Sequence, residues 1–102
     1  MLEVSTTVAK KGEAERIANV LLREKLAACV NYWKVSSVYR WNGKVWRKQE
    51  WILVVKTQDN SKKWVERRLR ELHPYELPVI VACPVKVDKK VEKWLKQSVR
   101  KG

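Results

Sequence analysis

The sequence predicts an α+β chain of the ferredoxin-like type, with the order β-α-β-β-α-β followed by a C-terminal helix. Three observations lead to this prediction. Strand-like and helix-like segments follow one another in that order along the chain. An Asn42-Gly43 pair stands between two long runs rich in valine, tyrosine and tryptophan, as in a tight hairpin. The length of 102 residues indicates one domain over residues 1–102.

The first βα unit is predicted from two hydrophobic periods. Residues 2–8 alternate apolar and polar side chains, which is typical of a strand with two unlike faces. After Gly12, apolar residues recur at helical spacing and predict a helix that ends near Leu26. Acidic residues near its start and basic residues near its end favour the helix dipole.

The central hairpin is predicted over residues 29–41 and 44–57. Each arm of about 13 residues reaches about 43 Å at roughly 3.3 Å per residue, whereas typical strands have about 5 or 6 residues. The extra length must project from the domain, and a bare aromatic ribbon would aggregate. We therefore expect it to be buried against sister subunits through Tyr39, Trp41, Val45, Trp46 and Trp51.

The second half of the chain repeats the helix and strand signals. A helix is predicted over residues 60–72, with Asp59 or Asn60 as its N-cap. Its buried stripe is expected to comprise Trp64, Val65, Leu69 and Leu72.

A fourth strand is predicted over residues 79–87, with Pro84 at a sheet edge. Asp88 is expected to cap a last helix, and residues 97–102 form a polar tail that is expected to fray. The buried stripe of this last helix is expected to comprise Val91, Trp94 and Leu95. Right-handed crossovers place the first strand between the third and the fourth.

The charge is high but spread along the chain. There are 23 Lys and Arg against 11 Asp and Glu, a formal charge of +12, and 45% apolar residues indicate a folded protein. Residues 1–55 hold 10 basic and 5 acidic side chains, and residues 56–102 hold 13 and 6. This balance favours solvated helix faces over a nucleic-acid patch. The sequence has no membrane span or signal-peptide pattern, so we expect a cytoplasmic protein.

Four segments match, in order and spacing, the pattern of the CutA divalent-cation tolerance proteins, which the chain therefore resembles. They are LAACVN at 26–31, SVYRWNGKV at 37–45, Glu50 with LVVKT at 53–57, and HPYELP at 73–78. The resemblance implies a cytoplasmic homotrimer with long hairpins, similar to the trimeric PII signalling proteins. It also implies a role in tolerance of copper and other divalent cations, as a metal-binding or signalling protein.

The metal ligands of this family carry over only in part. The resemblance implies a cysteine on the first strand and two adjacent histidines before Pro-Tyr as copper ligands. Thr6, Leu72 and His73 stand at these positions, so only His73 is retained. The acidic residue common after the second proline is replaced by Val79.

His73 therefore supports two interpretations. A histidine at a helix end before proline is commonly a cap or a packed side chain. Alternatively, His73 with Glu76 or Glu50 forms a borderline site for Cu(II) or Zn(II). We expect binding of Cu(II) or another divalent cation to be weak, and no metal to be required for folding.

The remaining residues exclude more than they indicate. Cys29 and Cys83 are expected to be small core residues, too far apart for a disulfide within one chain. The six tryptophans are expected in the core and at interfaces. A basic ferredoxin-like nucleic-acid-binding module is the alternative function, but it needs aromatic residues on the first strand, which has none. No nucleophile elbow or phosphate loop is present, so no enzyme is predicted.

Overall fold

A computed structural model of the chain describes residues 1–100 and shows the predicted α+β ferredoxin-like order. Its elements are β1 (Leu2–Val8), α1 (Lys11–Arg23), β2 (Cys29–Trp41), β3 (Lys44–Thr57), a 3₁₀ turn (Asp59–Ser61), α2 (Lys62–Leu72), β4 (Val81–Pro84) and α3 (Lys89–Ser98). The sheet is antiparallel in the order β2-β3-β1-β4. The predicted position of β1 between β3 and β4 is therefore confirmed.

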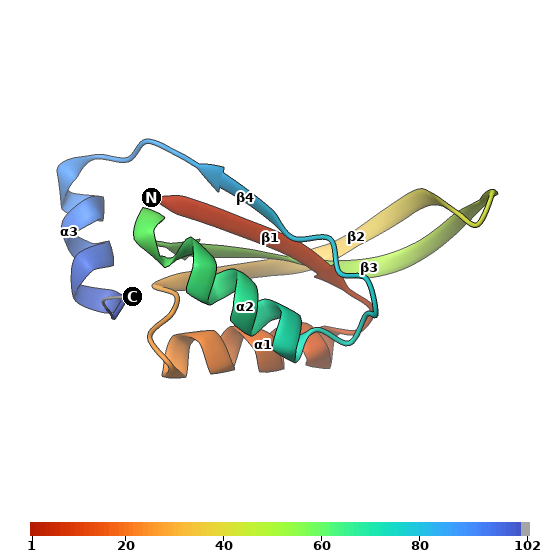
Figure 1. The fold of residues 1–102 in the computed structure, drawn as a ribbon, viewed down its shortest axis with the longest axis horizontal. Helices are drawn as coiled ribbons and strands as arrows, with labels where there is room; N and C mark the ends of the chain where they lie inside the picture. Colours follow the sequence, from red (N-terminus) through yellow and green to blue (C-terminus); the bar gives the residue numbers. More distant parts are fainter. Residues whose placement is uncertain (101–102) are drawn as a thin grey trace.

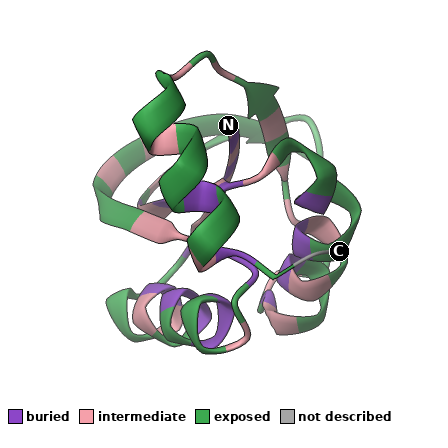
Figure 2. Cartoon of the chain, turned by 90° about the vertical axis from the view of Figure 1, so that its left-hand side faces the viewer, coloured by how far each residue is buried: buried purple, intermediate pink, exposed green. Residues whose placement is uncertain are grey.

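The sheet has one covered face and one open face. Helices α1 and α2 pack on one side of it, and α3 lies at the end near the N-terminus (Figure 1). Along β1, Leu2, Val4 and Val8 are buried beneath the helices, and the alternate residues point to the other face. Figure 2 shows the buried residues on the sides of α1 and α2 that turn toward the sheet. We call the side without helices the open face.

The hairpin projects as predicted. β2 and β3 pair over their whole length, out to Trp41 opposite Lys44, whereas β1 pairs with β3 only from Trp51 inward. The outer half of the ribbon therefore extends beyond the helices, along the 45 Å long axis of the molecule (Figure 1). Asn42 and Gly43 both have positive φ, 51° and 75°, which confirms the tight turn.

Both first helices differ from prediction at one end. Helix α1 ends at Arg23 rather than near Leu26, because Lys25 takes a left-handed conformation with φ of 58° and reverses the chain. Helix α2 begins at Lys62, since the preceding residues 59–61 form a 3₁₀ turn. Neither Asp59 nor Asn60 is its N-cap, and that prediction was wrong.

Compared with the prediction, the last strand is shorter and the last helix is longer. β4 is shorter than predicted and pairs only with residues 2–5 of β1, with Pro84 at the edge as expected. Helix α3 is capped by Asp88, whose carboxylate accepts the Val91 N–H at 2.9 Å, as predicted. The predicted fraying is wrong up to residue 100, because Val99 is buried and the Arg100 N–H bonds to Lys25. Residues 101 and 102 lie outside the described residues.

None of the six tryptophans is fully buried in the protomer. Val65 and Leu69 of α2 and Leu95 of α3 are buried as predicted, whereas Trp64 and Trp94 of the same predicted stripes are exposed. One residue along a helix turns the side chain by about 100°. A tryptophan next to the stripe therefore lies on its flank and remains exposed.

Candidate functional site at the base of the hairpin

The site lies where the projecting hairpin leaves the sheet. Because β4 pairs only with residues 2–5, the edge of β1 beyond them has no strand partner there. The segment that follows α2 returns to β4 past this end of the sheet (Figure 1). It brings His73 and Tyr75 beside β1 and the base of β3.

His73 is held by both ring nitrogens. It ends α2, is 9% exposed, and places Nε2 3.0 Å from the Thr6 hydroxyl. Its Nδ1 accepts the Tyr75 backbone N–H at 3.1 Å. Since Nδ1 accepts, the proton of the neutral ring is on Nε2, which donates to Thr6. Burial lowers the pKa of His73 and favours this neutral form.

Glu50 is a buried carboxylate on the open face. It is 6% exposed, accepts the Tyr75 hydroxyl at 2.5 Å, and lies 3.7 Å from the Lys48 ammonium. Burial alone raises the pKa of Glu50, but hydrogen bonds from Tyr75, Ser37 and Thr7, together with Lys48, outweigh it. The pKa of Glu50 is lowered, so the carboxylate stays ionised.

Lys48 supplies the positive charge beside Glu50. Its ammonium donates to the Tyr75 hydroxyl at 3.0 Å and lies 4.4 Å and 5.5 Å from the ring centres of Tyr75 and Tyr39. The hydrogen bond to Tyr75 and the charge of Glu50 raise the pKa of Lys48. Burial and the bond to Glu50 raise the pKa of Tyr75, so the hydroxyl remains neutral. Tyr75 thus links Lys48 to Glu50.

The ligands predicted for a metal are only partly brought together. Tyr75 contacts both His73 and Glu50, whereas Glu76 is exposed. Within residues 1–100, no three His, Cys, Asp or Glu side chains converge, and each buried polar side-chain atom has a partner. Residues 1–100 of one protomer therefore do not form a preformed metal site, and the Lys48 ammonium already neutralises Glu50. Sequence reasoning did not single out Tyr75, although it lies in the HPYELP segment.

Of the three positions where the resemblance implies copper ligands, two meet in space. Thr6 and His73 are in hydrogen-bond contact, and Leu72 is partly buried against the core. A hydroxyl thus stands where the resemblance implies a thiolate, and an alkyl side chain where it implies a second imidazole.

The residues predicted for a subunit interface fall into three groups. Tyr39, Trp41 and Trp46 share one face of the hairpin, which continues the open face, and Trp41 is 51% exposed. We call these three residues the aromatic face. Val45 points to the opposite face of the ribbon, since it pairs with position 40. Trp51 packs against the protomer's own core.

The two cysteines correct the expectation of core positions. Cys83 is exposed and Cys29 is partly exposed, because both point to the open face rather than toward the helices. They lie on opposite edge strands in one cross-strand row with Lys56 and Glu3 between them. A disulfide within the chain is therefore excluded by distance.

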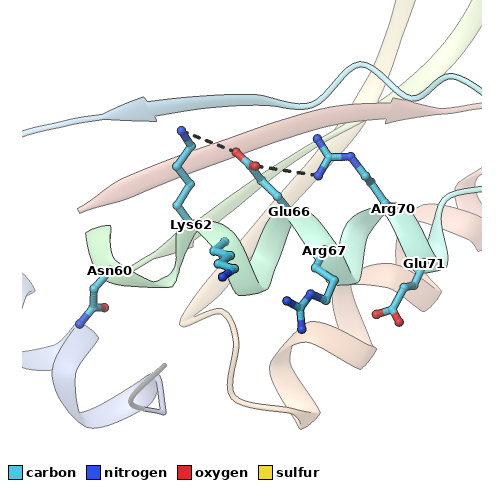
Figure 3. A pocket seen from close by; sticks show the side chains of 7 residues that line it. Asn60, Lys62, Glu66, Arg67, Arg70 and Glu71 are labelled. Carbon is cyan, nitrogen blue, oxygen red and sulfur yellow. Dashed lines mark ion pairs between the residues drawn. The ribbon is translucent and has the colours of Figure 1, made fainter.

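A hollow of about 670 Å³ follows the outer side of α2 (Figure 3). Its main acidic side chain, Glu66, lies between Lys62 at 4.0 Å and Arg70 at 3.9 Å, and these ion pairs lie on the helix surface. Lys63, Arg67, Glu71 and Asn60 complete its lining. Because Glu66 is already paired with both Lys62 and Arg70, these three side chains offer no free charge to a ligand.

Comparison with known proteins places the chain in one family. The model of the CutA1 divalent ion tolerance protein family matches residues 2–98. The divalent-cation tolerance protein CutA of Thermus thermophilus is 39% identical over 97 residues, which are 93% of this chain and 94% of that protein.

Solved structures agree with the sequence comparison. A crystal structure of a CutA1 variant from Pyrococcus horikoshii has a TM-score of 0.96 at 33% identity, covering 99% of this chain and 100% of that one. The PII-like protein CutA from a Nostoc species has a TM-score of 0.92 at 32% identity, with 98% of each chain covered. A CutA from Archaeoglobus fulgidus, described as periplasmic, has a TM-score of 0.93 at 34% identity, covering 98% of this chain and 100% of that one. By family match, sequence identity and PII-like fold together, the chain belongs to the CutA divalent-cation tolerance proteins.

Proposed function

We propose that residues 1–102 form a single CutA-like domain that acts in the tolerance of divalent cations, copper among them, as a homotrimeric binding or signalling protein rather than an enzyme. The observation that carries the proposal is the contact between Thr6 and His73, which stand at two of the family's ligand positions. Glu50 lies beside them, with its charge already engaged by Tyr75 and Lys48. Internal hydrogen bonds must break before His73 binds a metal, so binding is weak. The transient site comprises His73 with Glu50 and Glu76.

The proposed homotrimer is supported by what one protomer leaves uncovered. The aromatic face and Val81, 52% exposed, lie on or beside the open face of the sheet. Apolar surface of this extent is typical of an interface between subunits. In this proposal Tyr39, Trp41 and Trp46 contact neighbours, whereas Val45 points to the other side of the ribbon and stays outside this contact. Trp51 holds the base of the ribbon on its own core.

Calorimetry with Cu(II) at neutral pH tests the metal proposal. We expect a dissociation constant above about 1 μM, which corresponds to a binding free energy of less than about 8 kcal/mol in magnitude. His73→Ala should abolish binding if His73 is the anchor. Binding should also decline as the pH falls below the lowered pKa of His73, since only the neutral imidazole binds metal.

A gain of ligand makes the same test sharper. Thr6→Cys places a thiolate donor in contact with His73, and we expect it to tighten Cu(II) binding at least about tenfold, given the affinity of sulfur and imidazole ligands for copper. Thr6→Val is the matched control, because it fills the same buried position without a ligand atom. Equal affinity in both variants, or tight wild-type binding that survives His73→Ala, would place the metal elsewhere.

We propose that the protein acts in the cytoplasm, where thiols such as those of Cys29 and Cys83 stay reduced. No helix within residues 1–100 is long and apolar enough to cross a membrane. Fractionation of cells tests this placement, and recovery in a periplasmic fraction would contradict it.

The alternative of a sheet that stacks nucleic-acid bases has little support from the open face. A ribonucleoprotein-type module presents aromatic side chains on its first and third strands. On β1 the open-face residues are Glu3, Ser5 and Thr7, and on the inner part of β3 they include Ile52 and Val54. None of them offers an aromatic ring for stacking.

A further inference from the structure

The projecting hairpin differs in charge from the rest of the chain. Between Glu24 and Glu50 there is no Asp or Glu, although this segment holds six Lys and Arg side chains. Residues 1–24 hold four basic and four acidic side chains, so the whole positive excess of residues 1–55 lies after Glu24. The hairpin is therefore a positively charged arm on a protein whose helices carry both signs.

The basic side chains of the arm gather on one face. Arg40 is paired with Val45 and Arg47 with Val38, so both arginines point to the same side of the ribbon in diagonally adjacent positions. Lys34, opposite Trp51, continues this side toward the body of the molecule. We call Lys34, Arg40 and Arg47 the basic face, and all three are exposed.

The basic and aromatic faces lie on opposite sides of the ribbon. Successive residues of a strand point to opposite sides, and Tyr39 pairs with Trp46 on the side of the open face. The basic face continues instead the side on which α1 and α2 lie, beyond the point where they end (Figure 1). Burial of the aromatic face in the proposed trimer therefore leaves the basic face available.

Within residues 1–100, the side chains of the basic face form no ion pair. Lys48 is the one basic residue of β2 and β3 that forms an ion pair within residues 1–100, and it points to the other side. Guanidinium groups bind phosphate through two parallel hydrogen bonds, which suits a row of phosphodiesters. The nearby side chains Ser36 and Gln49 are neutral donors on the same face.

We propose that the basic face of the hairpin binds the phosphodiester backbone of a nucleic acid, without reading its sequence. Lys34, Arg40 and Arg47 provide up to three phosphate contacts for each protomer. The inference goes beyond the proposed function in cation tolerance and relies on it only for burial of the aromatic face in the trimer. Affinity falls as salt rises, with a slope of about 0.7 per contacted phosphate for single strands and about 0.9 for duplex DNA.

Fluorescence anisotropy with labelled single-stranded RNA and duplex DNA, each of about 20 nucleotides or base pairs, tests the proposal at several salt concentrations. Arg40→Gln with Arg47→Gln should weaken binding at least about tenfold at low salt and reduce the slope by about 1.4 to 1.8 for each bound protomer. Arg40→Lys with Arg47→Lys should restore most of the binding, since the charge remains. The two probes distinguish a single-stranded from a duplex partner.

The matched control removes the same charge elsewhere. Lys89→Gln with Lys90→Gln on α3, at the opposite end of the molecule, should change the affinity by less than about threefold (Figure 1). Equal losses in both double variants would show that the total charge alone attracts nucleic acid, and would overturn the proposal. Absence of binding by the wild type, or equal binding to anionic lipid vesicles through the same arginines, would overturn it as well.

Sedimentation of the Arg40→Gln and Arg47→Gln variant separates this inference from the proposed function. Unchanged assembly shows that lost binding does not come from dissociation of subunits. A different result is a wild type that sediments as a monomer and binds nucleic acid, together with a double variant that does not bind. That result would contradict the proposed trimer and support the proposed role of the basic face.

Discussion

At the scale of single residues, Tyr75 organises the candidate site. Its backbone N–H fixes the ring of His73, and its hydroxyl joins Lys48 to the buried Glu50. Each polar group is thus satisfied within the protomer, which stabilises the base of the hairpin and competes with any added cation. The same contacts set the protonation states of the two groups that respond to acid.

His73 makes the stability of the protein depend on pH near neutrality. Its folded-state pKa lies below the ordinary value of 6.5, so the unfolded chain binds a proton first as the pH falls. The stabilising effect of the neutral ring is complete above pH 6.5 and is lost as the pH falls from there toward the lowered pKa. Urea unfolding from about pH 7.5 to about pH 5.5, at constant protein concentration, measures this loss.

His73→Gln is the variant that isolates this effect. The variant should be less stable at neutral pH by about 1–3 kcal/mol, because the Tyr75 N–H or the Thr6 hydroxyl loses a partner. Its stability should change less between about pH 7 and about pH 6, since no group titrates at position 73. A pH dependence identical to that of the wild type would contradict the assignment to His73.

At the scale of elements, the end of α1 contains strain that a substitution can remove. Lys25 has a φ of 58°, a conformation that costs a side-chain-bearing residue roughly 1–2 kcal/mol. Its N–H bonds to the Leu22 carbonyl, and its own carbonyl accepts the Arg100 N–H. Both contacts come from the backbone and do not need the lysine side chain.

Lys25→Gly should therefore stabilise the protein. Glycine removes the left-handed strain, but the greater freedom of the unfolded chain lowers the free energy of unfolding by about 0.5–1 kcal/mol. The free energy of unfolding should therefore rise by a net amount of about 0.5–1 kcal/mol. Denaturant unfolding at one protein concentration measures the gain. Lys25→Ala is the control, because alanine retains the strain. Equal stability of the two variants would mean that the strain is absorbed elsewhere.

At the scale of the whole molecule, the aromatic face continues the open face of the sheet along the hairpin, and its three rings are exposed in the protomer. Trp41 lies at the tip of this surface, where its carbonyl accepts the Trp46 indole N–H at 3.1 Å. In the proposed trimer, this ring contacts a neighbouring subunit far from its own core. Large aromatic side chains commonly dominate such contacts.

Trp41→Ala should weaken the trimer by about 2 kcal/mol or more at each interface while the protomer still folds. Analytical ultracentrifugation across a range of concentrations, with circular dichroism as a check on folding, measures the effect. Trp94→Ala is the control, because Trp94 is comparably exposed but lies on α3 at the other end of the molecule. A wild-type protein that sediments as a folded monomer of about 12 kDa would refute the trimer.

Local sequence patterns were sufficient to predict the order of the elements. The alternation over residues 2–8, the Asn42-Gly43 turn and the Asp88 cap each depend on neighbouring residues, and the structure confirms all three. The four segments that match the CutA proteins also lie in the sequence itself. Helical periodicity did not predict the exposure of Trp64 and Trp94. Each is the sequence neighbour of a buried residue and therefore lies on the flank of the buried stripe.

The contacts of the candidate site required the tertiary structure. Thr6 and His73 are 67 residues apart, and Tyr75 and Glu50 are 25 apart, so no local pattern shows that they touch. Strand pairing decides which side of the hairpin carries Arg40 and Arg47 and which carries Trp41. The fold class and the family are encoded in local periodicity and motifs, so the amino-acid sequence was enough to predict both. The bonded state of His73 and the two unlike faces of the hairpin depend on contacts between distant segments, so they became visible only in the folded chain.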